Sequence, residues 1–158
     1  MIMNCSEFKF TTNTASKESI REHLMRCANS FQPALHTYVD VDTYANKLST
    51  NAVTFESWDE NLLIGLVAAY YNNNETRIGF ITNVSVLEEY QGAGIASQLL
   101  RSALDFARQN RFVRVDLELN ITNIKALRLY EQHRFVLSER KNNDCVVMSC
   151  ALSPLPNE

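Results

Sequence analysis

Two glycines in the middle of the chain stand where a strand is expected to lead into a helix. Residues 84–97 read VSVLEEYQGAGIAS. The first backbone N–H groups of a helix have no partner inside that helix, and the helix dipole adds partial positive charge at the same end. Glycine lets the backbone approach a bulky anion, because no Cβ atom stands in the way. The stretch therefore predicts a cradle for phosphate groups.

The specificity of this pattern depends on its context, because many turns carry a glycine only for a tight corner. No Gly-Lys-Ser/Thr follows, so the stretch is not a Walker loop. It is not a dinucleotide fingerprint either, because the third glycine is missing and the strand does not open a repeated βαβ unit. A second cluster of motif residues further along the chain, at 123–135, sets the stretch apart from a simple turn.

The composition is that of an ordinary soluble domain. The 158 residues are 46% apolar and 21% charged, which suits one domain with a sizeable core. The net charge of -3 gives no basic footprint for nucleic acid. Four cysteines without a CxxC pair predict reduced thiols and a cytoplasmic protein. The chain carries no long apolar segment, so neither a signal peptide nor a membrane span is expected.

The apolar periodicity predicts the elements that must position the two clusters. The N-terminal half is expected to hold a strand at 8–12, a helix at 16–29, a loop at 30–39, a short helix capped by Asp40 or Asp42, and an antiparallel meander of strands at 52–58, 62–71 and 77–86. The C-terminal half is expected to hold a helix at 94–110, a strand at 113–119, a helix from Asn123 to about His133, and a hairpin of strands at 135–139 and 145–152. Helix 94–110 joins two strands as a βαβ unit, so these strands should be parallel. Residues 1–152 should form one domain, followed by a loose tail at 153–158.

Taken together, the two clusters resemble the signatures of the GNAT superfamily of acyl-CoA-dependent N-acetyltransferases. The first cluster resembles the pattern Q/R-x-x-G-x-G/A, with Gln91, Gly94 and Ala96 in register. The second resembles N-x-x-A-x-x-L-Y-x-x-x-G-F, and the matching residues are Asn123, Ala126, Leu129, Tyr130 and Phe135. One position departs, because Arg134 stands where the family usually has glycine. If that position is left-handed, the departure costs about 1 kcal/mol and affects the loop after the helix.

The resemblance implies an α/β fold, the GNAT acyltransferase fold, with a mixed central β-sheet, a splayed parallel strand pair and flanking helices. It also implies acetyl-CoA as cosubstrate and no metal. In the family, the glycine loop holds the CoA pyrophosphate on backbone N–H groups, a bulged strand pairs with the pantetheine arm, and an asparagine bonds to that arm. Carried over to this chain, the expected CoA-binding residues are Val84, Ser85, Val86, Gln91, Gly92, Ala93, Gly94, Ile95, Ala96, Ser97 and Asn123.

The same resemblance implies a general acid. The family tyrosine near the thioester sulfur corresponds to Tyr130. A phenol beside the leaving thiolate can give it a proton, which is ordinary general acid catalysis. The alternative is that Tyr130 only packs on an amphipathic helix.

The general base is less obvious, because strand 77–86 carries no carboxylate. Its polar candidates are Thr82, Asn83 and Ser85. The L-E-L segment around Glu118 instead resembles a segment of the ribosomal-protein N-terminal acetyltransferases, in which the glutamate is proposed as base. Glu118 is therefore the candidate base, directly or through water, and the alternative is that it belongs to the solvated face of an alternating strand.

The family uses the loop after its first helix to bind the acceptor. The candidate substrate-binding residues are Phe31, Tyr38, Thr82 and Asn83. We expect acetyl transfer to a primary amine, first of all a small molecule such as an amino sugar or a polyamine. A protein or peptide N-terminus is the second candidate acceptor, and a CoA-binding module without catalysis is a different class. The protein is expected to be a monomer or homodimer that binds no nucleic acid, and its three histidines show no metal-ligand spacing.

Overall fold

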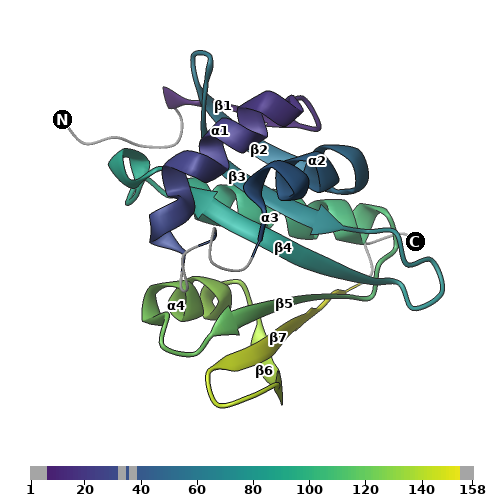
Figure 1. Cartoon of the computed structure of the whole chain (residues 1–158). Coiled ribbons are helices and arrows are strands. Elements are labelled where there is room, and N and C mark those ends of the chain that lie inside the picture. Colours follow the sequence, from purple (N-terminus) through teal and green to yellow (C-terminus); the bar gives the residue numbers. More distant parts are fainter. Residues whose placement is uncertain (1–6, 32–34, 36–38, 154–158) are drawn as a thin grey trace.

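The computed structural model describes residues 7–31, 35 and 39–153. Within them, seven strands form one sheet in the order β1-β2-β3-β4-β5-β7-β6, and β4 and β5 are its parallel pair (Figure 1). The strands are β1 (Lys9–Thr12), β2 (Val53–Asp59), β3 (Leu62–Tyr70), β4 (Ile78–Val86), β5 (Arg114–Asn120), β6 (Val136–Arg140) and β7 (Cys145–Ala151). The helices are α1 (Lys17–Cys27), α2 (Val41–Asn51), α3 (Ile95–Gln109) and α4 (Ile124–Gln132), with short 3-10 turns η2 (Ala28–Ser30) and η4 (Glu88–Tyr90). The predicted α/β fold class is confirmed.

Side chains at the helix starts explain where the helices begin. The side chains of Ser16 and Asp40 each accept a hydrogen bond from the N–H three residues further on, at the starts of α1 and α2. The cap of α2 is thus Asp40 and not Asp42. At β4, Arg77 has a left-handed φ of 57°, so the strand begins at Ile78, one residue later than predicted.

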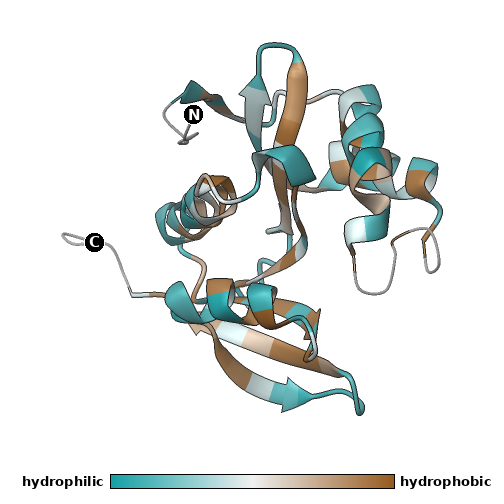
Figure 2. Ribbon diagram, turned by 90° about the vertical axis from the view of Figure 1, so that its left-hand side faces the viewer, coloured by the Kyte–Doolittle hydropathy of each residue, from teal (hydrophilic) through white to brown (hydrophobic). Residues whose placement is uncertain are grey.

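Helices cover the sheet on both faces. In Figure 1, α1 and α2 lie in front of the sheet and α3 lies behind it. The central strand β3 is therefore buried on both sides: Leu66 and Ala68 pack with α1 and α2, while Val67 and Ala69 belong to the cluster that contains α3. Figure 2 shows the apolar colour on the strands between the helices. This two-sided burial explains why β3 reads as a continuous apolar run rather than an alternating one.

Close packing against β3 fixes the start of α3. A Cβ atom at Gly65 would lie only 2.7 Å from Cγ2 of Ile95 and 3.1 Å from Cδ1 of Leu99. Glycine suits this position because the side chains of Ile95 and Leu99, in the first turns of α3, occupy the space that a Cβ atom would need. The N-terminus of α3 is thereby held beside the end of β4.

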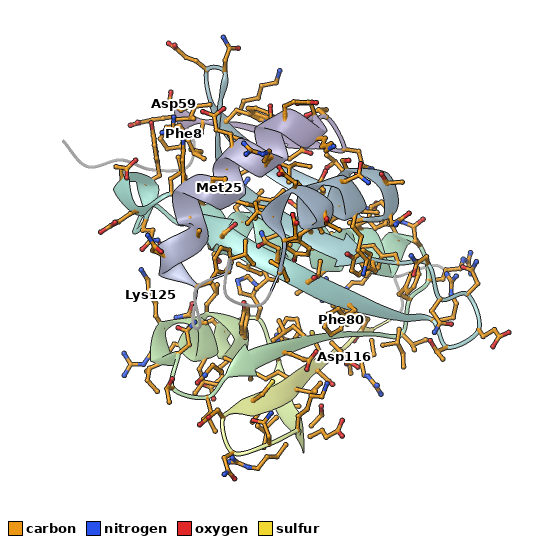
Figure 3. All side chains as sticks on the ribbon, in the orientation of Figure 1. Phe8, Met25, Asp59, Phe80, Asp116 and Lys125 are labelled. Atoms are coloured by element: carbon orange, nitrogen blue, oxygen red, sulfur yellow. The ribbon has the colours of Figure 1, made fainter. Side chains whose placement is uncertain are left out.

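The parallel strands β4 and β5 separate half-way along β4. They pair from Ile78 opposite Arg114 to Ile81 opposite Leu117, whereas β5 stays paired with β7 along its whole length. The pairing of β4 with β3 shifts register between Ala68 and Ala69, which makes Thr82 the extra residue of a β-bulge. Figure 1 shows β4 and β5 close together at one end and wide apart at the other, and Figure 3 labels Phe80 and Asp116 where they still pair. The splayed pair is as predicted, and it leaves the edge of β4 from Thr82 to Val86 without a strand partner on the β5 side.

Candidate active site

A groove of about 960 Å³ opens where β4 and β5 diverge. The end of α1, the C-terminal halves of β4 and β5, the glycine loop, the start of α3 and helix α4 all contribute to it. The predicted site residues that line it are Phe31, Thr82, Asn83, Val84, Ser85, Val86, Gln91, Gly92, Gly94, Ile95, Ala96, Ser97, Glu118, Asn123 and Tyr130. Ala93 is not among the lining residues and packs against the core instead. Tyr38 lies outside the described residues.

The glycine loop has the backbone conformation that its residues predict. Gly92 has φ 86° and Gly94 has φ 83°, both left-handed, and a Cβ atom at either position would meet nothing within 4 Å. Gly94 is the N-cap of α3 and offers no side chain to the first turn. Within the described part of the chain, the N–H groups of residues 92–97 have no hydrogen-bond acceptor, and the first bonded one belongs to Gln98. Six consecutive N–H groups at a helix N-terminus are thus without an acceptor in the described residues, which fits a bound pyrophosphate.

Lys125 adds a cation beside the loop, and the sequence did not single it out. Its Nζ lies 2.8 Å from Oε1 of Gln91, whose Nε2 in turn donates to the carbonyl of Val86 at 3.1 Å. Lys125 lines the groove from α4 (Figure 3), together with the carboxylates of Glu88 and Glu118. Among the described residues that line the groove, Lys125 is the one with a positive charge. Lys125 lies inside the second signature, two residues after Asn123, and this position could have indicated it from the sequence.

Tyr130 is buried, with 8% of its surface exposed, and it still lines the groove. Burial raises the pKa of its phenol, so the hydroxyl keeps its proton throughout the neutral range. Within the described residues the hydroxyl has no hydrogen-bond partner. A protonated phenol that faces the groove can donate a proton but cannot remove one.

The end of α4 explains how Tyr130 is held. The N–H of Phe135 bonds to the carbonyl of Tyr130 at 3.1 Å, and the N–H of Arg134 bonds to that of Glu131 at 3.0 Å. These two bonds form a Schellman motif, in which the left-handed residue is Arg134 with φ 69°. The rings of Phe135 and Tyr130 pack with centroids 5.8 Å apart. The spacing of tyrosine, glycine and phenylalanine in the family signature is therefore that of a helix end, and Arg134 tolerates the same geometry under strain.

Two further contacts fix α4 against the neighbouring loop. Asn123 caps the helix, because its Oδ1 accepts from the N–H of Ala126 at 3.2 Å. Oγ of Ser97, in the first turn of α3, lies 2.8 Å from Nε2 of His133. The pKa of His133 is lowered by burial and by the charge of Arg101. The glycine loop and Tyr130 are thus parts of one connected assembly.

Glu118 lines the groove from β5, with its carboxylate in an ion pair. Its Oε1 lies 2.8 Å from Nζ of Lys141 and 3.8 Å from Sγ of Cys145. The side chain is 36% exposed and points to the face opposite the buried Leu117 and Leu119. Both of these contacts are made by Oε1, and the role of Glu118 as base stays a prediction.

The acceptor side of the groove contains residues that the sequence did not indicate. The hydroxyl of Tyr44, on α2, donates to the carbonyl of Thr82 at 2.9 Å and lies 2.8 Å from its Oγ1. This contact stabilises the bulge at which the parallel strands part. Cys27 and Leu35 also line the groove. Burial raises the pKa of the Cys27 thiol to about 11, so it is protonated at neutral pH and is not a nucleophile.

A family model identifies the protein family of this chain. The model described as the acetyltransferase (GNAT) family matches residues 17–135, which include the glycine loop, Glu118 and Tyr130. The chain belongs to the acetyltransferase (GNAT) family. This confirms the resemblance of the two motifs, and members of the GNAT family are acyl-CoA-dependent transferases.

Individual relatives cover only part of the chain. It is 31% identical over 78 residues to streptothricin acetyltransferase A of Bacillus subtilis (strain 168), covering 49% of this chain and 44% of that protein. It is 28% identical over 89 residues to N-alpha-acetyltransferase 30 of Schizosaccharomyces pombe (strain 972 / ATCC 24843), covering 55% of this chain and 59% of that protein. The chain thus matches about half the length of these curated relatives.

Solved structures share the fold over nearly the whole chain. The ribosomal-protein-S18-alanine N-acetyltransferase from Escherichia coli superposes with a TM-score of 0.77 at 17% identity, covering 96% of this chain and 97% of that one. The structure of yncA from Salmonella typhimurium with its cofactor acetyl-CoA gives a TM-score of 0.74 at 14% identity, covering 95% and 96%. At this identity the likeness concerns the fold.

Membrane-spanning helices and metal sites are the last two features of the described residues. Of the helices in residues 7–31, 35 and 39–153, none is long and apolar enough to cross a membrane. The same residues contain no group of three or more His, Cys, Asp or Glu side chains that is arranged to hold a metal ion.

Proposed function

We propose that this protein transfers the acetyl group of acetyl-CoA to the primary amine of a small molecule, such as an amino sugar or a polyamine. The observation that carries the proposal is the coexistence of two features in one groove. One is the row of unpaired N–H groups at the glycine loop, and the other is the protonated hydroxyl of Tyr130. The first suits a phosphate-bearing acyl donor and the second suits its leaving thiolate.

Acetyl-CoA would lie along the length of the groove. The N–H groups of residues 92–97 would bind the pyrophosphate, and Lys125 would exchange its bond to Gln91 for a phosphate oxygen. The unpaired edge of β4, residues 82–86, would bond to the amides of the pantetheine arm as an added strand. Asn123 lies beside this path at the start of α4.

The reaction needs two proton transfers and the stabilisation of one negative charge. The neutral acceptor amine attacks the thioester carbon through its nitrogen lone pair. The nitrogen becomes positively charged in this attack and gives one proton to a base, for which Glu118 is the candidate. An N–H group at the bulged edge of β4 would stabilise the negative oxygen of the tetrahedral intermediate. The C–S bond then breaks, and Tyr130 gives its proton to the sulfur. The products are the acetylated amine and CoA.

A protein or peptide N-terminus is the second candidate acceptor. The relatives include a streptothricin acetyltransferase and an N-alpha-acetyltransferase, so they leave both acceptor classes open. Glu118 favours the second class, because the segment around it resembles the segment that carries the glutamate proposed as base in the ribosomal-protein N-terminal acetyltransferases.

A thiol-release assay separates these proposals. Acetyl-CoA would be incubated with the protein alone, with a panel of amino sugars and polyamines, and with short peptides that have a free N-terminus. We expect release above the amine-free background with one class of small amines. Release with peptides only would favour the second candidate, and acetyl-CoA binding without release for any amine would make the protein a non-catalytic CoA-binding module.

A further inference from the structure

Three buried polar side chains connect α1 to the strand that flanks the acceptor side of the groove. They are His23 on α1 and Asn83 and Ser85 on β4, which are 1%, 4% and 9% exposed. Figure 1 shows α1 lying across this part of the sheet. Nδ1 of His23 lies 2.9 Å from the carbonyl oxygen of Leu63, and its Nε2 lies 2.9 Å from Oγ of Ser85.

The contacts determine which nitrogen of His23 carries the proton. A carbonyl oxygen can only accept, so Nδ1 must carry the hydrogen that bonds to Leu63. Burial lowers the pKa of His23 to about 4, so the ring is neutral at pH 7 and Nε2 is an acceptor. The hydroxyl of Ser85 therefore donates to Nε2. The protonated thiol of Cys27, with Sγ 3.7 Å from Nε2, is a second and weaker donor.

The same reasoning determines the orientation of the Asn83 carboxamide. Its Nδ2 lies 3.2 Å from the carbonyl oxygen of Leu66 and 2.9 Å from Oγ of Ser85. The carbonyl of Leu66 accepts only, and Ser85 has already used its proton on His23. Both contacts thus require the NH₂ group of Asn83 on this side. The carboxamide oxygen is turned away from them, and no donor among the described residues contacts it.

We propose that His23 is a positioning residue that, through Ser85, holds the carboxamide oxygen of Asn83 toward the groove to accept a hydrogen bond from the N–H of the acceptor amine. Asn83 lines the groove immediately after the bulge at Thr82, where the strands part. An oxygen that accepts one N–H of the amine aligns the nitrogen lone pair for attack and favours an acceptor that retains N–H groups. The inference rests on the proposed function, because it assigns a residue to its acceptor site.

Two substitutions of His23 separate positioning from packing. His23→Asn keeps a donor near the position of Nδ1 and loses the acceptor at Nε2, whereas His23→Gln keeps an acceptor near the position of Nε2. Loss of one hydrogen bond to substrate typically costs about tenfold in rate or affinity. We expect His23→Asn and Asn83→Ala each to lower kcat/KM for the amine about tenfold, with little change in KM for acetyl-CoA, and His23→Gln to recover most of the loss. The double variant His23→Asn with Asn83→Ala should be no worse than Asn83→Ala alone.

Glu56→Gln serves as a control for stability. Glu56 is fully buried on β2, where it accepts hydrogen bonds from Thr11, Thr14 and Thr54, and it does not line the groove. This variant should lower the melting temperature and leave kcat/KM for the amine unchanged. If the His23 variants behave like Glu56→Gln, or if the effects of His23→Asn and Asn83→Ala add up, His23 is a packing residue and the inference is wrong.

The histidine tautomer provides a test that needs no turnover. ¹⁵N NMR of the free protein at pH 7 should show His23 with its proton on Nδ1, and a proton on Nε2 would overturn the inference whatever the activity. Absence of amine-dependent turnover in the unmodified protein would overturn the proposed function together with the assignment of Asn83. Turnover with an unaffected His23→Asn variant would overturn the inference alone.

Discussion

The proposed role of Tyr130 as general acid depends on its phenol oxygen. The phenol is protonated, packed on Phe135, and has no hydrogen-bond partner among the described residues. We expect Tyr130→Phe to keep the fold and acetyl-CoA binding and to lower turnover about 10²- to 10⁴-fold, the usual contribution of a general acid. The loss should appear in kcat more than in KM, because the proton is needed only in the transition state. Steady-state kinetics and calorimetric titration with acetyl-CoA measure the two quantities, and wild-type turnover would make Tyr130 a packing residue.

Substitutions of Glu118 and of Lys141 distinguish a role of Glu118 as base from a role in the ion pair alone. If Glu118 is the base, Glu118→Gln should lower kcat and remove the acidic limb of the pH–rate profile. Lys141→Met breaks the same ion pair but leaves the carboxylate in place, so it should retain turnover. A pH–rate profile of each variant is the measurement. Equal behaviour of the two variants would mean that Glu118 serves only the surface ion pair.

The helix end after α4 carries a strain that can be measured. Arg134 occupies the left-handed position of the Schellman motif, where glycine pays no steric cost. We expect Arg134→Gly to stabilise the protein by about 0.5–1 kcal/mol, after the greater freedom of glycine in the unfolded chain is subtracted. Arg128→Gly, on the exposed face of the same helix, should instead destabilise by about 1 kcal/mol. Urea denaturation of both variants tests this, and equal destabilisation would contradict the assignment of strain to Arg134.

The attachment of α1 to the sheet should make stability depend on pH. The pKa of His23 is about 4 in the folded protein because of burial, and its ordinary value is 6.5. Between these values the unfolded chain binds the proton and the folded protein does not, so stability falls as the pH drops from 6.5 to 4 and is fully retained above 6.5. The difference corresponds to about 3 kcal/mol for this one group. Urea denaturation at several pH values should show a smaller loss for His23→Gln than for the unmodified protein, and an equal loss would contradict the burial of a neutral His23.

The order of elements could be predicted because it depends on local patterns. The alternation of β5, the caps Ser16 and Asn123, and the glycines of the loop are all legible within a few residues. The pairing of β4 with β5 followed from the βαβ connection.

The contacts between distant side chains could not be predicted in the same way. The bond from His23 to Ser85 joins positions 62 residues apart, and the bond from Lys125 to Gln91 joins positions 34 apart. No local periodicity records such proximity, which arises only when α1 and α4 pack onto the sheet. Tyr44 likewise lies in the short helix expected after Asp40, while its contact with the bulge at Thr82 depends on how α2 lies over β4.

At the scale of the whole molecule, the sheet opens at one end, and a helix N-terminus and a buried phenol both face the opening. The splay of β4 and β5 begins at the bulge, α3 is held close to β3 at Gly65, and α4 closes the groove next to the glycine loop. We propose that this opening binds acetyl-CoA through the backbone of the loop. This mode of binding is independent of which amine accepts the acetyl group.

Calorimetric titration of acetyl-CoA into the unmodified protein and into Gly94→Val tests whether the loop backbone binds the cosubstrate. A branched side chain at Gly94 would project into the space that the pyrophosphate needs and would strain the left-handed residue by about 1–2 kcal/mol. Glu60→Val is the matched control, because Glu60 is also left-handed, with φ 54°, and does not line the groove. We expect Glu60→Val to bind acetyl-CoA like the unmodified protein, and Gly94→Val to fold but no longer to bind acetyl-CoA. Equal affinity for Gly94→Val and the unmodified protein would contradict this mode of binding.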